Sequence, residues 1–333
     1  MPIDPHRRSI LAASLSAAGL LAIPGAARAQ AGFPGGKPIR FIVPWNAGGS
    51  NDIAARAISS ILADQGIRVI VENVPGATGA IGMTRVANAD PDGLTVGMGT
   101  SSTLSIIAQN LAPLRSEQFA NIARVTTDPL VLLVPNSGPA TTLESFVAHV
   151  RKNPGKITIG TPGNNNLNHY FAIMTGRVAG SEIIATPYTG GSRVIVDLAG
   201  KQIDAAVLKP SESKGQMDAG LVKAIGVFAN DRLRALPDVP TFKEKGFDVY
   251  PYGMLVQMAY IVAPAKTPAA IRDRLITIFS SAIQHPKFKT LAAEGGALID
   301  DMTGDSLTRE INAVQRSLGE VARKVFPPAA SAK

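Results

Sequence analysis

The chain has no cysteine among its 333 residues, and this absence excludes several classes of site. Neither a disulfide framework nor a thiolate metal site can form, and no N-terminal cysteine is available to carry a lipid. The four histidines include no HExxH pair, so they do not indicate zinc either. We therefore expect no metal ion.

Aromatic residues are also scarce, at 5% of the chain, and Trp45 is the only tryptophan. The formal net charge of +8 favours anionic partners, but the basic residues are scattered and form no block. Nucleic-acid surfaces combine clustered basic residues with stacking aromatic residues. We therefore expect no nucleic-acid partner and a modest preference for anions.

Motifs that would indicate an enzyme or a nucleotide site are missing as well. The chain has no GxxxxGK[ST] phosphate loop and no GxSxG nucleophile elbow. Gly76, Gly79 and Gly82 have GxxGxxG spacing, which differs from the dinucleotide-binding fingerprint, so this turn is interpreted as structural. The sequence therefore offers no catalytic residue and implies no cofactor.

Residues 1–29 have the pattern of a signal peptide. Arg7 and Arg8 precede an Ala/Leu-rich run, and Ala27 to Ala29 supply a small-residue cleavage site. The apolar run is shorter than the roughly 20 residues of a membrane span, so we expect cleavage and export. The adjacent arginines leave the twin-arginine route open. Cleavage would remove three arginines and one aspartate and lower the formal charge from +8 to +6.

The stretch from Ile39 to Leu62 predicts a strand, a loop and a helix. Residues 39–43 are mostly apolar, whereas the apolar residues of 53–62 recur at helical spacing. The loop between them, 46–51, reads NAGGSN and has no bulky side chain, so its backbone amides can approach a ligand. A helix N-terminus at the end of a parallel strand attracts anions. The loop is therefore either an anion site or a tight turn with ordinary capping.

The same pattern returns along the chain and predicts an α/β protein with parallel sheets. Loops rich in glycine, hydroxyl or amide side chains follow several predicted strands, at 73–82, 100–103, 161–169 and 187–192. Because parallel strands end at one edge of a sheet, we expect these loops to converge. Their polar groups either bind a ligand or cap helices. The predicted strands are 39–43, 68–72, 94–99, 130–134, 156–160, 182–186, 203–208, 224–228 and 255–263.

The mature chain, at roughly 300 residues, exceeds the usual size of one domain, so we expect two lobes. The apolar strands 130–134 and 255–263 bracket the middle of the chain, and we place the crossings between lobes there. Lobe I is then 32–127 plus 255–333, and lobe II is 128–254.

Five segments occur in order along the mature chain: VPWNAGGSNDIAAR at 43–56, VENVPGATGAIG at 71–82, PDGLTVGMGT at 91–100, YTGGSRVIVDLAGKQID at 188–204 and LPDVPTFKEKGF at 236–247. Together they resemble the signature segments of the solute-binding proteins of tripartite tricarboxylate transporters, also called the Bug family. The resemblance implies a type II periplasmic binding protein fold, in which two α/β lobes close over a ligand cleft. It also implies that the protein captures a small organic carboxylate, such as a di- or tricarboxylate or an aromatic acid, and presents it to membrane permease subunits.

Two alternatives remain beside this interpretation. An exported α/β enzyme that acts on a carboxylate would need a nucleophile or an acid and base in a persuasive context, and the sequence shows none. A ligand-sensing partner of a membrane sensor kinase would use the same cleft, so the sequence cannot separate it from a transport protein. We further expect a monomer.

The resemblance also implies that strand-end loops of both lobes hold the carboxylate through backbone amides, hydroxyl groups and water. Trp45, His169 and Lys209 are added from their positions beside these loops, although each has a structural interpretation as core packing, capping or a solvent-exposed ammonium at the cleft rim. Asn46 and Lys209 depart from the residues common in the family. The candidate ligand-binding residues are Trp45, Ala47, Gly48, Gly49, Ser50, Thr100, Ser101, Ser102, Gly163, Asn164, Asn165, Asn166, His169, Tyr188, Gly190 and Lys209.

Overall fold

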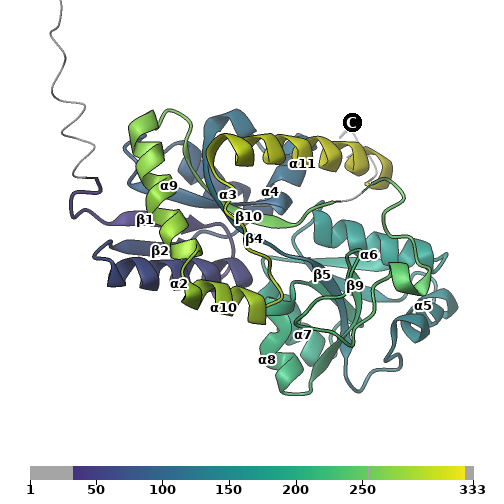
Figure 1. The fold of residues 1–333 in the computed structure, drawn as a ribbon. Coiled ribbons are helices and arrows are strands. Elements are labelled where there is room, and N and C mark those ends of the chain that lie inside the picture. Colours follow the sequence, from purple (N-terminus) through teal and green to yellow (C-terminus); the bar gives the residue numbers. More distant parts are fainter. Residues whose placement is uncertain (1–32, 254, 327–333) are drawn as a thin grey trace, which may run out of the picture. The chain divides into compact units, whose positions relative to one another are not determined.

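Alternating strands and helices form two five-stranded sheets covered by helices (Figure 1). The computed structural model describes residues 33–253 and 255–326, so the predicted signal peptide lies outside the described residues. Within those two ranges, no helix is long and apolar enough to cross a membrane.

The first sheet has the strand order β2-β1-β3-β10-β4. In this sheet β1, β2 and β3 are parallel, and β10 runs antiparallel between β3 and β4. Its strands are β1 (Ile39–Val43), β2 (Val69–Asn73), β3 (Thr95–Thr100), β4 (Phe119–Thr127) and β10 (Met258–Pro264).

The second sheet repeats this arrangement with the order β7-β6-β8-β5-β9. Here β6, β7 and β8 are parallel, and β5 runs antiparallel to both β8 and β9. Its strands are β5 (Leu130–Pro135), β6 (Thr158–Pro162), β7 (Ile184–Tyr188), β8 (Ala205–Leu208) and β9 (Val222–Phe228).

The predicted parallel arrangement holds for β1, β2 and β3 and for β6, β7 and β8, but each sheet also contains one antiparallel strand that was not predicted. In both sheets this strand is the one that arrives from the other sheet. Ala259, near the start of β10, pairs with Thr100 at the end of β3, and Val131 in β5 pairs with Leu208 at the end of β8. The arriving chain thus enters each sheet at the carboxyl edge of the parallel strands and must run against them.

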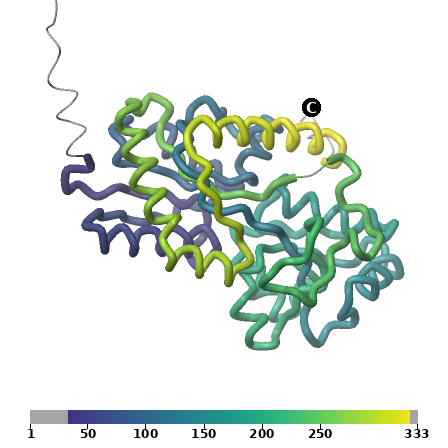
Figure 2. The backbone as a smooth tube through the Cα atoms, in the orientation of Figure 1, coloured from purple at the N-terminus to yellow at the C-terminus, as the bar shows by residue number. Residues whose placement is uncertain are grey.

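The two passages between the sheets lie side by side (Figure 2). Asp128 lies in the first passage, between β4 and β5, and its amide donates to the carbonyl of Gln257, just before β10, at 2.8 Å. The Ser101 hydroxyl donates to the Val256 carbonyl at 2.8 Å and accepts from the Met258 amide at 3.0 Å. Ser101, a predicted ligand-binding residue, therefore fixes the second passage. The division into lobes at these passages stays a prediction.

Helices cover both faces of each sheet. On the first sheet, α3, α4 and α11 lie on one face and α2 and α9 on the other (Figure 1). In the second sheet, Leu130 and Leu132 of β5 pack in the same buried cluster as Phe146 and Phe171 of α5 and α6, whereas Val131 packs with α7. The helices are α2 (Ser50–Asp64), α3 (Ala80–Ala87), α4 (Ser101–Ala108), α5 (Leu143–Lys152), α6 (Leu167–Val178), α7 (Gly191–Ala199), α8 (Pro210–Asp218), α9 (Ala269–Ile283), α10 (Pro286–Glu294) and α11 (Gly304–Val325).

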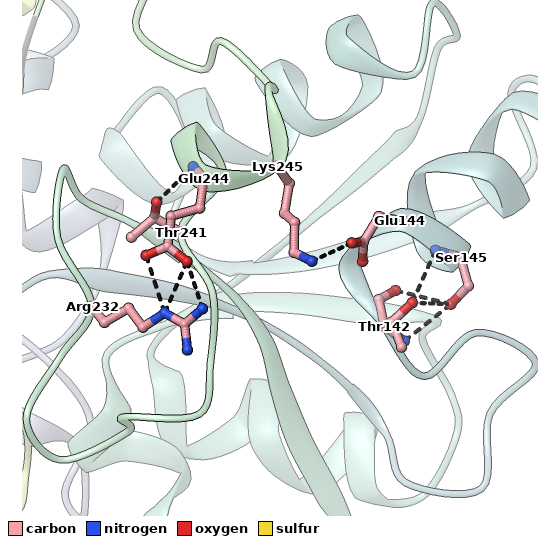
Figure 3. Close-up of polar contacts among 7 residues, drawn as sticks. All are labelled: Thr142, Glu144, Ser145, Arg232, Thr241, Glu244 and Lys245. Carbon is pink, nitrogen blue, oxygen red and sulfur yellow. Dashed lines mark hydrogen bonds and ion pairs between the residues drawn. The ribbon is translucent and has the colours of Figure 1, made fainter.

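The segment that joins β9 to β10 has one surface ion pair within itself and one to helix α5, and an aromatic side chain is buried beneath them. Arg232 pairs with Glu244 at 2.7 Å, and Lys245 reaches Glu144 of α5 at 2.5 Å (Figure 3). Exposed pairs of this kind contribute little, about 0–1 kcal/mol at most. Phe242 is fully buried and stacks on Phe228 with ring centroids 4.4 Å apart, so burial of this ring is the main anchor.

Two helical glycines allow a matched test of close packing. A Cβ on Gly82 of α3 would lie 2.7 Å from the Val74 carbonyl oxygen and 2.9 Å from the Pro44 Cα, both backbone atoms, whereas a Cβ on Gly215 of α8 would meet nothing within 4 Å. We expect Gly82→Ala to lower the free energy of unfolding by about 1–3 kcal/mol. Gly215→Ala should leave it unchanged or raise it, since alanine favours helix. Urea denaturation measures the free energy of unfolding of both variants. Equal values would show that α3 moves to accommodate the added methyl group without loss of stability.

Candidate ligand-binding site

The loop after β1 presents only part of its backbone to a ligand. The Gly48 amide donates to the Asp52 carboxylate at 2.9 Å, so this amide already has an anionic partner. Burial raises the pKa of Asp52, but hydrogen bonds from Arg56, Gly48 and Asn73 outweigh it and hold the pKa below its usual value. Ala47 and Gly48 are exposed. The part of the loop that faces inward therefore begins at Gly49, the N-cap of α2.

A small pocket lies where strands of both sheets end, and we call it the Trp45 pocket. Its volume is about 20 Å³, which accommodates about one water molecule. A larger ligand therefore requires the flanking loops to separate. The pocket is lined by Trp45, Asn46, Gly49, Ser50, Asn51, Thr100, Ser102, Pro162, Asn168, Gly190, Gly191, Lys209, Glu212 and Gln257.

Three buried polar atoms of this pocket have no hydrogen-bond partner. They are the indole Nε1 of Trp45, the Oδ1 of Asn51 and the Oε1 of Gln257, and each of these residues is 7–8% exposed. An unpaired buried polar atom costs about 1–3 kcal/mol, so most buried groups in proteins are paired. Their concentration in one pocket indicates that these groups are arranged for a ligand.

A hydrogen bond from β2 fixes the backbone at Trp45, while its indole N–H has no partner. The side chain of Asn73 donates to the Trp45 carbonyl at 3.1 Å and to Asp52 at 3.0 Å, which ties the end of β2 to the loop after β1. An indole N–H can only donate a hydrogen bond. The unpaired Nε1 is therefore suited to an acceptor such as a carboxylate oxygen.

Lys209 was predicted either to bind the ligand or to lie exposed at the cleft rim, and the structure places it in a buried ion pair instead. Its Nζ donates to the Asp128 carboxylate at 2.8 Å, and both side chains are 5% exposed. The expectation of a solvent-exposed ammonium at the cleft rim is therefore wrong. Lys209 lines the pocket, but Asp128 already balances its charge, so it is not a free cation for a ligand.

Glu212 lies at the junction of three helices and was not predicted from the sequence. Its carboxylate accepts from the Ser50 hydroxyl of α2 and from the Lys209 amide at the start of α8, both at 3.2 Å. A Cβ on Gly191, the first residue of α7, would lie 2.5 Å from its carboxyl carbon. Burial raises the pKa of Glu212, while the charge of Lys209 and these hydrogen bonds oppose that effect.

The three helix N-termini that meet at Glu212 create a positive potential. Gly49, Gly190 and Lys209 are the N-caps of α2, α7 and α8. The N-terminus of a helix carries roughly half a positive elementary charge and attracts anions. The carboxyl group of Glu212 uses part of this potential. Glycine at position 191 leaves the space that this carboxyl group occupies.

A second cavity, here called the outer pocket, adjoins the Trp45 pocket and shares Trp45 as a wall. Its volume is about 440 Å³, and it is lined by Trp45, Gly76, Ala77, Thr78, Gly163, Asn164, Pro187, Tyr188 and Thr189. Two contacts connect its sides. Asn46 donates to the Thr189 hydroxyl at 2.7 Å, and Thr78 lies 3.3 Å from both the amide and the carbonyl of Asn164.

Several residues of the loop after β6 are structural. Asn166 is the N-cap of α6, because its side chain accepts from the His169 amide at 2.9 Å and donates to the Pro162 carbonyl at 2.9 Å. The His169 Nδ1 accepts from the Asn165 amide at 3.0 Å, and its ring stacks on Phe326. Burial lowers the pKa of His169 to about 4. His169 is therefore neutral near pH 7 and brings no charge to a carboxylate.

The predicted residues thus divide into groups. Gly49, Ser50, Thr100, Ser102, Gly190 and Lys209 line the Trp45 pocket, Gly163, Asn164 and Tyr188 line the outer pocket, and Trp45 lines both. The Tyr188 hydroxyl already donates to Asp197 at 3.0 Å. The other predicted residues, Ala47, Gly48, Ser101, Asn165, Asn166 and His169, are not among the residues that line these two pockets.

Gly191 also lines the Trp45 pocket and belongs to the predicted loop 187–192, whereas six further lining residues were not among the candidates, namely Asn46, Asn51, Pro162, Asn168, Glu212 and Gln257. For Gln257 a signal existed, because it is a polar residue inside the otherwise apolar run 255–263. For Glu212 there was none, since α8 has no apolar periodicity that would reveal a helix. No group of three or more potential metal ligands of the His, Cys, Asp or Glu type occurs within the described ranges.

The buried ion pair predicts a stability effect at Lys209. Removing one partner of a buried pair leaves an uncompensated charge and costs about 3–5 kcal/mol. Lys209→Met should therefore lower the free energy of unfolding by several times more than Lys214→Met, which breaks an exposed pair with Asp218 within helix α8. Denaturant unfolding compares the two variants. Equal stability of the two variants would show that the loss of its ion-pair partner at Asp128 does not destabilise the fold.

Comparison with known proteins places this geometry in a family. Residues 53–323 match the model described as the tripartite tricarboxylate transporter family receptor. The chain is similar to a UPF0065 protein of Bordetella pertussis, with 32% identity over 297 residues, covering 88% of this chain and 90% of the relative.

Solved structures show the same fold. The chain is similar to the periplasmic binding protein BugD, with 26% identity, a TM-score of 0.78 and coverage of 86% of this chain and 97% of BugD. It is also similar in fold to MatC from Rhodopseudomonas palustris, a structure with bound malate, at 24% identity and a TM-score of 0.79, covering 86% of this chain and 99% of MatC. The predicted resemblance and the predicted fold class are confirmed.

Proposed function

Because the chain belongs to the tripartite tricarboxylate transporter receptor family, also called the Bug family, we propose that it binds a small organic carboxylate at the Trp45 pocket and delivers it to a membrane permease. The observation that carries this proposal is the unpaired, buried indole N–H of Trp45, beside the N-termini of α2 and α7. A donor without a protein acceptor in a positive potential suits an anion.

The ligand on this proposal spans both pockets. The Trp45 pocket has room for about one water molecule, and the outer pocket offers about 440 Å³ on the other side of the same indole. One carboxylate would bind at the Trp45 Nε1, and the remainder of the molecule would extend toward Tyr188 and Thr189. The bound malate of MatC, which shares this fold, supports a ligand of this size.

Binding on this proposal is coupled to separation and closure of two lobes, 32–127 with 255–333 and 128–254. The division of the strands between two sheets supports it. The Asn46–Thr189 and Thr78–Asn164 contacts, which connect loops of the two sheets, would break when the pocket opens and re-form around the ligand. The bonds from Ser105 and Gln109 to the Asn165 carbonyl and from Ser50 to Glu212 also join the two parts and would be exchanged on opening.

We also propose that the protein acts in the periplasm as a monomer and binds its ligand without converting it. The family is one of receptors, and the solved relative BugD is a periplasmic binding protein. The signal-peptide pattern of residues 1–29 supports export. Calorimetry with mono-, di- and tricarboxylates and aromatic acids tests the function: one-to-one binding without product supports it, and no binding across the panel contradicts it.

Trp45→Phe isolates the contribution of the indole N–H. Phenylalanine keeps an aromatic ring but has no donor, and a hydrogen bond to a charged group contributes about 1.5–3 kcal/mol. We expect the dissociation constant for the carboxylate that binds to rise about 10- to 100-fold. The melting temperature serves as the control for folding. Unchanged affinity in a well-folded variant would show that the indole does not contact the ligand.

A further inference from the structure

The charges of the Trp45 pocket are unusual for a site that takes only an anion. Its two charged lining residues are Lys209 and Glu212. Lys209 is paired with Asp128 at 2.8 Å, whereas no basic side chain in the described ranges forms an ion pair with Glu212. Glu212 is therefore an acidic residue of the pocket without an ammonium partner of its own, because Lys209 already pairs with Asp128.

The position of Glu212 is fixed and directed into the pocket. The Ser50 hydroxyl and the Lys209 amide each bind one of its two oxygens at 3.2 Å. The glycines at positions 49 and 191 leave space for the carboxyl group between α2 and α7. The carboxyl group therefore takes up part of the positive potential of the helix N-termini, and the Trp45 indole is the buried, unpaired side-chain donor that remains for a ligand carboxylate.

The unpaired groups of the pocket complete this picture. A carboxylate has about four lone-pair directions, and the structure gives Glu212 two donors. The amide ends of Gln257 and Asn51 each have an oxygen without a donor. One buried side-chain donor without a partner, the Trp45 N–H, thus lies beside two buried amide oxygens without partners and a carboxyl group with free acceptor capacity. A ligand with one acceptor and several hydrogen-bond donors complements these groups.

We propose that Glu212 makes the pocket selective for a carboxylate that also carries an ammonium group, as in an amino acid. The ligand carboxylate accepts from the Trp45 indole, and the ligand ammonium donates to Glu212 and to the Gln257 amide oxygen. An ammonium brings three donors and a positive charge, which complement the free acceptors and the unpartnered carboxyl group of Glu212. This inference rests on the proposed function, since a carboxylate at Trp45 is its premise.

The test compares ligands that differ only in the ammonium group. Calorimetry measures the affinities of aspartate and succinate, glutamate and glutarate, and alanine and propionate for the mature protein. We expect the wild type to bind the amino member of at least one pair about tenfold or more tightly than its partner, as a charge-assisted contact provides. Glu212→Gln, which keeps the shape but not the charge, should bring that ratio close to one. Glu320→Gln, the same change at an exposed position of α11, should leave the ratio intact.

The outcomes separate the inference from the proposed function. Carboxylates that bind without any preference for the ammonium overturn the inference alone, as does a preference that survives in Glu212→Gln. Tighter binding of succinate or glutarate than of the amino member would also overturn it, because it would make Glu212 a protonated donor to a second carboxylate. Absence of binding by every member of all pairs overturns the inference, whereas the proposed function is contradicted only when the wider panel of tricarboxylates and aromatic acids also fails to bind.

Discussion

The buried ion pair between Lys209 and Asp128 is the constraint on which the site depends. Asp128 lies in the short passage from one sheet to the other, and Lys209 is the N-cap of α8 directly after β8. The same Asp128 donates its amide to Gln257 in the second passage. One pair of charges, 5% exposed on both sides, therefore connects the two passages to the wall of the Trp45 pocket. On our proposal of lobe closure, a change in the pocket is therefore coupled to a movement of the two passages.

The pocket itself combines opposite electrostatic tendencies. Helix N-termini attract an anion, and the chain supplies one of its own in Glu212. This carboxyl group is held by the Ser50 hydroxyl and the Lys209 amide, so moving it would break both hydrogen bonds. On our proposal, recognition of a ligand carboxylate falls to the Trp45 indole, and the remaining acceptors determine which donors the ligand must carry.

The sequence predicted those parts of the fold that have a strong local pattern. The strand 39–43 and the apolar stripe of α11, from Leu307 to Val321, appear where expected. The strand β4 and the helix α8 were missed, since β4 mixes Asn121 and Arg124 with apolar residues and α8 reads PSESKGQMD. The loops of the site could be predicted from glycine and amide residues, but Glu212 and Asp128 could not, because their importance comes from partners far away in the chain.

The single tryptophan allows the central claim to be measured at one atom. In a ¹⁵N-labelled protein, Trp45 gives the only indole N–H resonance. Titration with a carboxylate whose binding is established by calorimetry should shift this resonance downfield and saturate at one equivalent, as expected when an unpaired indole N–H gains a charged acceptor. An indole resonance that does not move while calorimetry shows full occupancy would contradict the account, because the ligand would then bind without contacting Trp45.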